Sequence, residues 1–145
     1  MATMTGTAEI CAEEISTALG AAGIESEMQL MDSVGTDALR AFEFVVIVSS
    51  TYGHGDIPDN GQALFEALGA ADNLAGIRFT VFGLGDRTYA ATFCEAGRKW
   101  DALFAEKGAS RFAPLVQHDA GSGTLAEDVA GAWAAEWAAQ LRQAA

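Results

Sequence analysis

The sequence is short of basic residues. It has 8 lysines and arginines against 20 aspartates and glutamates, which gives a formal net charge of −12. This balance argues against nucleic acids and anionic membranes as partners, because both attract basic protein surfaces. The charge suits docking onto a basic protein surface, although solubility alone is the simpler explanation for it.

Cysteine is scarce as well, and long apolar runs are absent. Cys11 and Cys94 stand far apart, and the two histidines have no thiol partners at metal-binding spacing. We therefore expect reduced thiols in a cytoplasmic protein, and no metal site. No run is long and apolar enough to span a membrane, and no basic-then-apolar leader opens the chain, so we expect no membrane partner.

The sequence does have enough apolar residues for a core. Half of its 145 residues are hydrophobic, and a domain of this length buries roughly two-thirds of its surface without disulfides or a metal. We expect a single domain, residues 1–145. Trp100, Trp133 and Trp137 fall on the apolar faces of predicted helices, which favours a core position over contact with a cofactor.

The pattern centres on the segment 44–60, FVVIVSSTYGHGDIPDN. Its first five residues form an unbroken apolar run, which is typical of a strand buried on both faces. Polar residues, glycines and a tyrosine follow, as expected for a loop whose backbone approaches a flat ligand. An open α/β sheet presents its ligand in this way, at the carboxyl ends of its strands.

Strands and helices alternate along the rest of the chain, which predicts a parallel sheet covered by helices on both sides. We expect Asn60 to cap its helix, Pro114 to place the last strand at an edge, and Leu125 to face inward. The expected elements are a helix at 8–20, an edge strand at about 24–30, a strand at 43–48, a helix from 60, a strand at 77–82, a helix from about 93 that ends at Gly108, a strand at 111–117 and a C-terminal helix from about 125.

A threonine-rich loop, residues 3–9, precedes the first predicted helix. It offers three hydroxyl groups, a glycine and the free N–H groups of a helix N-terminus, which together suit a phosphate. It holds no lysine or arginine and does not match the nucleoside-triphosphate loop GxxxxGK[ST]. An ordinary helix start with threonine caps explains the same residues equally well.

Two further loops each end a predicted strand and carry a tyrosine, Tyr52 in residues 50–56 and Tyr89 in residues 83–89. Two aromatic rings on neighbouring strand ends can sandwich a planar heterocycle. With the phosphate loop, they indicate a mononucleotide that has a large flat base. A single loop tyrosine is more often a surface turn residue, but the same placement on two loops favours the ligand.

The motifs TMTGTAE, SSTYGHGDIPDN and GLGDRTYAATFC, in this order and spacing, resemble the three FMN loops of the flavodoxin-like family. The likeness is strongest to short-chain flavodoxins of the MioC type and to the FMN domains of diflavin reductases. It implies an α/β three-layer sandwich with a parallel sheet of order 2-1-3-4-5. It also implies non-covalently bound FMN and a role in electron transfer.

By position, the resemblance assigns FMN contacts to all three loops. The first loop would hold the phosphate, the second would line one face and the N5 edge of the ring, and the third would line the other face. Asp119, after the last strand, is a further candidate. The residues so assigned are Thr3, Met4, Thr5, Gly6, Thr7, Ala8, Ser50, Thr51, Tyr52, Gly53, His54, Gly55, Gly83, Leu84, Gly85, Asp86, Tyr89, Phe93, Cys94 and Asp119.

The chain departs from the family at its N-terminus. The family has a buried strand before the phosphate loop, at the centre of the sheet, whereas this sequence opens at Met1 where that strand should be ending. The first strand is therefore expected to be truncated or missing, which would leave backbone groups of its neighbours unpaired. We expect the natural protein to begin several residues upstream.

The resemblance implies a small carrier that moves single electrons from an NADPH-dependent flavoprotein reductase to an acceptor enzyme with a basic docking surface. A small FMN-dependent reductase is the alternative enzyme, although no dinucleotide loop is present to hold NAD(P)H. A third possibility is a binding module without FMN, if the missing strand abolishes cofactor binding.

Overall fold

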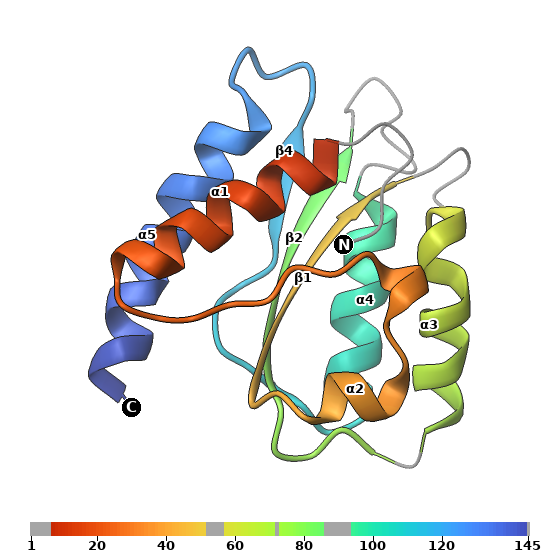
Figure 1. Ribbon diagram of the computed structural model, residues 1–145. Coiled ribbons are helices and arrows are strands. Elements are labelled where there is room, and N and C mark those ends of the chain that lie inside the picture. Colours follow the sequence, from red (N-terminus) through yellow and green to blue (C-terminus); the bar gives the residue numbers. More distant parts are fainter. Residues whose placement is uncertain (1–6, 52–56, 72, 86–93, 145) are drawn as a thin grey trace.

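The computed structural model describes residues 7–51, 57–71, 73–85 and 94–144 (Figure 1). Within this part of the chain, none of the helices is long and apolar enough to cross a membrane. The helices are α1 (Thr7–Ala21), the 3₁₀ turn η1 (Met31–Ser33), α2 (Thr36–Arg40), α3 (Asp59–Ala70), α4 (Glu95–Glu106) and α5 (Ala126–Ala144).

The strands are β1 (Phe44–Ser50), β2 (Arg78–Gly85), β3 (Ser110–Arg111) and β4 (Val116–Asp119). β1 pairs with β2, and β2 also pairs with β3 and then with β4, always in parallel. The single strand predicted at 111–117 is wrong in its extent, because the ladder breaks between β3 and β4. Pro114 lies in that break, and a proline has no N–H to donate to a ladder.

Helices cover both faces of the sheet, which confirms the predicted α/β sandwich. Figure 1 shows α1 and α5 on one side, and α2, α3 and α4 on the other. Two separate apolar clusters correspond to these two faces. Side chains of β1 alternate between them: Ile47 belongs to the cluster under α3 and α4, and Val48 to the cluster under α1 and α5.

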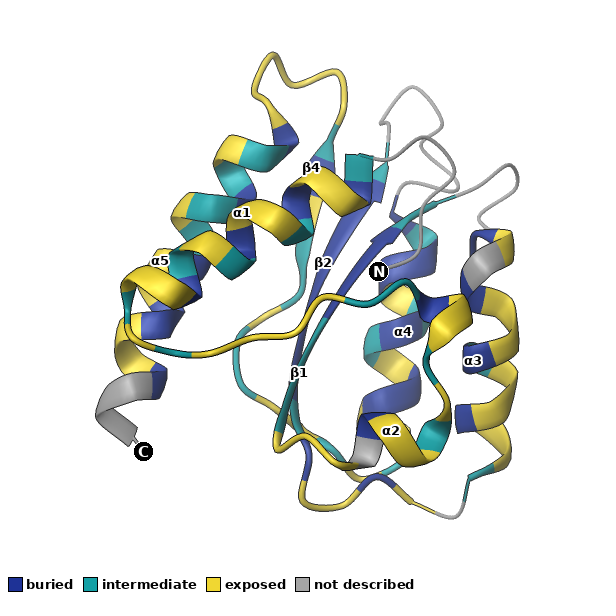
Figure 2. Cartoon of the chain, in the orientation of Figure 1, coloured by how far each residue is buried: buried dark blue, intermediate teal, exposed yellow. Residues whose placement is uncertain are grey.

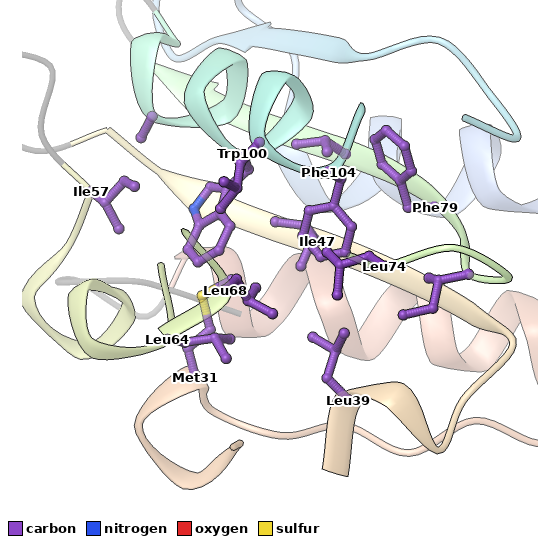
Figure 3. Close-up of a cluster of buried hydrophobic side chains, with 14 residues drawn as sticks. Met31, Leu39, Ile47, Ile57, Leu64, Leu68, Leu74, Phe79, Trp100 and Phe104 are labelled. Carbon is purple, nitrogen blue, oxygen red and sulfur yellow. The ribbon is translucent and has the colours of Figure 1, made fainter. Parts of the chain in front are cut away.

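The cluster under α3 and α4 holds Trp100, the largest fully buried side chain. Figure 3 shows Trp100 and Phe104 of α4 beside Ile47 of β1 and Phe79 of β2. Phe65 of α3 meets Trp100 edge to face, with ring centroids 5.1 Å apart. Figure 2 shows that most of β2 is buried, as expected for a strand covered by helices on both faces. The predicted core positions of Trp100 and Trp137 are confirmed, and Trp133 packs against the second cluster.

Two helix starts differ from the predictions. α3 begins at Asp59 after Pro58, so Asn60 lies inside the first turn instead of capping it. Proline fixes φ near the helical value and is well suited to a helix start. α5 begins at Ala126, and Leu125 just before it is 60% exposed. The prediction that Leu125 faces inward is therefore wrong. It assumed that Leu125 follows the helical periodicity of α5, but the helix begins one residue later.

The predicted edge strand at about 24–30 is also wrong, since these residues form no regular structure. A strand needs a neighbour for its backbone groups, and the first strand that would separate this segment from β1 is not found among the described residues. The prediction on that first strand concerns residues 1–6, which lie outside the described part. A cavity of about 450 Å³ lies between residues 24–29 and β1.

Candidate functional site

The carboxyl ends of three strands meet at one edge of the sheet. Val48 of β1 pairs with Phe82 of β2, and Ser50, the last residue of β1, pairs with Leu84. Gly85, the last residue of β2, pairs with Asp119, the last residue of β4. The predicted second and third FMN loops therefore leave the sheet side by side, as the parallel arrangement requires.

Helix α1 begins at the same edge. Figure 1 shows its first turn beside the tips of the strand arrows. Thr7 and Ala8, both predicted to hold a phosphate, form that first turn. The first four N–H groups of an α-helix have no partner within the helix, and the helix dipole favours an anion there. The other predicted phosphate residues, Thr3, Met4, Thr5 and Gly6, lie outside the described residues.

The polar residues that end β1 join the strand to α4. Ser49 is fully buried; its hydroxyl donates to the carbonyl of Ser50 (3.0 Å) and accepts from the indole N–H of Trp100 (3.2 Å). The backbone N–H of Thr51 donates to Leu84 (3.1 Å), and its hydroxyl accepts from the N–H of Ala96 (3.3 Å). Sequence reasoning placed Ser50 and Thr51 at the ligand but missed these structural bonds, which only the packing of α4 creates.

The rest of the predicted second loop, Tyr52, Gly53, His54 and Gly55, lies outside the described residues. So do Asp86, Tyr89 and Phe93 of the third loop. For these positions the prediction stands as it was made from the sequence. Only the ends of the two loops, or loop bases, are described. These are the residues at the ends of β1 and β2, and Cys94 at the end of the third loop.

The base of the third loop is packed too tightly for side chains. A Cβ atom on Gly85 would lie 2.6 Å from the backbone nitrogen of Cys94, and one on Gly97 would lie 3.0 Å from the Cα atom of Gly83. Both distances are below ordinary van der Waals contact, so these glycines let α4 and the loop end approach β2. Leu84, between the two glycines of β2, is buried in the cluster under α1 and α5.

Cys94 holds the returning loop against two strands. It is fully buried, and its thiol donates weakly to the carbonyls of Gly83 and His118, each 3.6 Å away. It precedes α4 with φ 51° and ψ 26°, the left-handed conformation, which costs a non-glycine residue about 1 kcal/mol. The predicted helix from about 93 is wrong at its start, because Cys94 precedes α4 and lies outside it.

The loop after β4 is fixed by a short hydrogen-bond series. Asp119 accepts from the N–H of Gly121 (2.9 Å), and Ala120 donates to Gly85 (2.8 Å). His118 is buried, stacks on Phe82 with ring centroids 6.4 Å apart, and shares a 3.0 Å hydrogen bond with Thr124. Asp119 therefore lies at the same edge as the other predicted residues that are described, and the contacts of His118 are structural.

The described groups at this edge suit an anion such as a phosphate, because the start of α1 offers backbone donors and the positive end of the helix dipole. Among the described residues, no group of three or more histidine, cysteine or acidic side chains is close enough to hold an ion.

A parallel sheet with helices on both faces and a ligand edge formed by β1, β2 and the start of α1 defines an α/β protein of the mononucleotide-binding class. The profile of the flavodoxin family matches residues 1–133. The chain belongs to the flavodoxin family. Flavodoxins are flavoproteins that transfer electrons, so the chain is an electron-transfer protein rather than an enzyme.

Several relatives match nearly the whole chain. The protein PA3435 of Pseudomonas aeruginosa is 38% identical over 142 residues, which are 94% of this chain and 92% of the relative. Flavodoxin YqcA of Escherichia coli is 31% identical over 142 residues, or 96% and 93%. The solved structure of a cysteine-to-alanine mutant of flavodoxin from Pseudomonas aeruginosa superposes with a TM-score of 0.86 at 35% identity, covering 97% of this chain and 95% of that one.

A longer relative contains a similar segment. The sulfite reductase [NADPH] flavoprotein alpha-component of Mannheimia succiniciproducens is 36% identical over 121 residues, which are 82% of this chain but 20% of that protein. The chain thus spans about a fifth of this relative's length. These comparisons confirm the predicted resemblance to flavodoxins and to segments of NADPH-dependent flavoproteins.

Proposed function

We propose that the chain binds FMN at the carboxyl edge of its sheet and carries single electrons between other proteins. The observation that supports this most directly is that the described bases of all three predicted FMN loops meet at one edge. Thr7 and Ala8 begin α1 there, Ser50 and Thr51 end β1, and Gly85 ends β2. Bound FMN supplies the redox chemistry, and the protein supplies binding and orientation.

The phosphate of FMN would bind the first turn of α1. Backbone N–H groups and the Thr7 hydroxyl would receive it, together with Thr3, Met4, Thr5 and Gly6 on the preceding loop. Because the predicted loop has no basic side chain, the phosphate would depend on these donors and on the helix dipole. FMN should therefore bind at least about tenfold more tightly than riboflavin, which lacks the phosphate.

The flat ring would lie between the second and third loops. Tyr52 and Tyr89 would stack on its two faces, and Gly53 would turn its carbonyl to N5, which a glycine permits at little cost. The second loop would also contribute Ser50, Thr51, His54 and Gly55. The third would contribute Gly83, Leu84, Gly85, Asp86, Phe93 and Cys94, and Asp119 would approach from β4.

Equilibrium titration of apoprotein with FMN, followed by flavin fluorescence, tests this site. Tyr52→Ala and Tyr89→Ala should each weaken FMN binding by up to about tenfold, the factor expected for one lost stacking contact. Phe42→Ala is the matched control, because Phe42 is an exposed aromatic residue two positions before the amino end of β1. The proposed site is wrong if both tyrosine variants bind FMN as tightly as the Phe42 variant.

We further propose that the carrier accepts electrons from an NADPH-dependent flavoprotein reductase and passes them to an enzyme with a basic docking surface, in the cytoplasm. The first turn of each described α-helix carries an acidic residue. In α1, α3, α4 and α5 these are Glu9, Asp59, Glu95, and Glu127 with Asp128. Part of this pattern is explained by the helix dipole. The same acids add negative charge around the proposed site, and complementary charge mainly speeds association.

Charge reversal tests the docking surface. The double variant Glu9→Lys, Asp59→Lys should slow reduction by a flavoprotein reductase by about tenfold at low salt, and the difference should shrink as salt is added. The control double variant Glu66→Lys, Glu136→Lys changes the net charge equally at exposed positions beyond the first turns. Equal rates for the two double variants would remove the support for docking at this edge.

A further inference from the structure

The start of α4 lacks the usual side-chain cap. Commonly, an oxygen on the residue before the first turn accepts a hydrogen bond from the second or third N–H of a helix. Cys94 holds this position, and it makes no side-chain cap hydrogen bond. Its thiol donates to the carbonyls of Gly83 and His118, each 3.6 Å away. The N–H groups of the first turn therefore need an acceptor from elsewhere in the fold.

Thr51 supplies such an acceptor from the end of β1. Its hydroxyl oxygen accepts the N–H of Ala96, the second residue of α4, at 3.3 Å. The two residues are 45 positions apart in the sequence. Ala96 is fully buried, so water cannot easily replace the hydroxyl, and a buried N–H without a partner is unfavourable. Thr51 thus caps a helix to which it does not belong.

The backbone of Thr51 is fixed at the same time. Its N–H donates to the carbonyl of Leu84 (3.1 Å), one residue beyond Ser50, the last residue of β1. A β-branched side chain is also stiff about χ1. The residue is therefore held by β2 through its backbone and holds α4 through its side chain, which fixes the distance between these two elements at the edge of the sheet.

The bond between Thr51 and Ala96 joins the two predicted loops that flank the ring. Thr51 directly precedes Tyr52 in the second loop, and Cys94 ends the third loop two residues before Ala96. A single hydrogen bond thus connects the beginning of one loop with the end of the other. The separation of the loops matters for stacking, because a gap of about 0.5–1 Å already loses roughly a quarter to a half of the dispersion energy at a contact.

We propose that Thr51 is a positioning residue, which caps α4 and so sets the separation of the second and third loops before the ligand binds. This role rests on the proposed function of those loops in holding FMN. A preset separation lowers the ordering cost of binding, so loss of the hydroxyl should weaken FMN binding. The effect passes through Ala96, unlike that of a residue that acts only by touching the ligand.

Amide hydrogen exchange followed by NMR tests the cap in the apoprotein. Thr51→Val keeps the shape of the side chain without its hydroxyl, and Thr51→Ser keeps the hydroxyl. Relative to the Phe82 amide within β2, the Ala96 amide should exchange at least about fivefold faster in Thr51→Val and less than about twofold faster in Thr51→Ser. The Phe82 reference corrects for a change in global stability. Both variants should fold, because one hydrogen bond is small against the stability of a typical domain.

Titration of the apoprotein with FMN tests the positioning role. Thr80→Val is the matched control, because the Thr80 hydroxyl also bonds to the backbone of a distant residue, the carbonyl of Ala113 (3.1 Å). Thr80 is the third residue of β2 and lies away from the end that leads into the third loop. Thr51→Val should weaken FMN binding at least about fivefold, Thr51→Ser should retain most of it, and Thr80→Val should leave it within about twofold.

Three results would overturn the proposal. Unchanged Ala96 exchange in Thr51→Val would mean that Thr51 does not cap α4. Faster Ala96 exchange with unchanged FMN affinity would confine the bond to stability, and an equal loss of affinity in Thr80→Val would trace the effect to general destabilisation. If the unsubstituted chain binds no FMN, the proposed function fails and the positioning role fails with it, whereas Ala96 exchange still shows separately whether Thr51 caps α4.

Discussion

Ser49 and Trp100 show how single polar groups hold the proposed site in place. The serine lies one residue before the end of β1, and the tryptophan crosses from α4 to reach its hydroxyl at 3.2 Å. Both side chains are fully buried, so the indole N–H of Trp100 depends on the Ser49 hydroxyl for its hydrogen bond. The pair fixes the spacing between α4 and the strand that leads into the second predicted FMN loop.

Ser49→Ala should lower the free energy of unfolding by about 1–3 kcal/mol, because it leaves the buried indole N–H without a partner. Urea unfolding measures the loss. The double variant Ser49→Ala, Trp100→Phe removes both partners and should lose less than the sum of the two single changes. Ser16→Ala, which deletes an exposed hydroxyl bonded to Ser26, should cost within about 0.5 kcal/mol. A Ser49→Ala cost no greater than this would contradict the role given to the pair.

The buried thiol of Cys11 makes the stability of the fold depend on pH. Burial, followed by the charges of Glu127 and Glu14, raises the pKa of its thiol to about 12 from an ordinary value of 9.0. Above pH 9 the unfolded chain loses this proton while the folded chain keeps it, so stability should fall as pH rises from 9 to 12. The slope from this group is at most about 1.4 kcal/mol per pH unit. In Cys11→Ala, the free energy of unfolding measured with urea should fall less steeply between about pH 8 and 10.5. An equally steep fall in this variant would contradict the role given to Cys11.

Sequence reasoning at the residue scale succeeded where burial follows from residue type. It placed the core tryptophans correctly. It could not foresee that Cys94 takes a left-handed conformation and bonds to carbonyls of β2 and β4, because those partners are distant in sequence. The bond between Thr51 and Ala96 was missed for the same reason.

Among the elements, α4 makes an especially close approach to the sheet. Gly97 on the helix and Gly83 on β2 face each other with no room for a Cβ atom. This contact brings the start of α4 to the ends of β1 and β2, where the loops of the proposed site leave the sheet. A glycine inside a predicted helix was the sequence signal for such an approach, since glycine otherwise weakens a helix.

Gly97→Ala should therefore destabilise the protein by about 1–3 kcal/mol, the usual cost of inserting a methyl group into a packed contact. Gly69→Ala in α3 is the matched control, because it meets no atom within 4 Å. There the better helix propensity of alanine should stabilise the protein by up to about 1 kcal/mol. Thermal unfolding of the two variants should thus shift Tm in opposite directions. A downward shift of the same size for both would contradict the close packing.

Whether a long segment forms a helix or a strand was predictable from the sequence. The break in the strand at 111–117 and the absence of a strand at 24–30 were not. The apolar runs of β1 and β2 and the periodicity of α1 and α4 are strong local signals. The segment 24–30 has a similar alternation, but a strand also requires a neighbour with free backbone groups. No described strand pairs with this segment, so the prediction was wrong. Likewise, one apolar run at 111–117 did not reveal that Pro114 divides it.

At the scale of the whole molecule, the sequence predicted the fold class, the family and the edge that carries the proposed site. Ordered motifs on three loops carried this information, because each motif suits a different part of one ligand. The described residues show those loop bases together, while most of the loop residues lie outside the described part. The expected truncation of the first strand concerns residues 1–6, which lie outside the described part. The cavity beside β1 was not predicted, because its walls combine residues of both apolar clusters that are distant in sequence.

The central claim is that the chain is an FMN-dependent carrier of single electrons. Its most direct test is a stepwise reductive titration of the protein saturated with FMN, followed by absorbance and electron paramagnetic resonance. The account predicts one FMN per chain and uptake of the two electrons in two separate stages. A single two-electron stage like that of free FMN, or the absence of bound FMN, would contradict it.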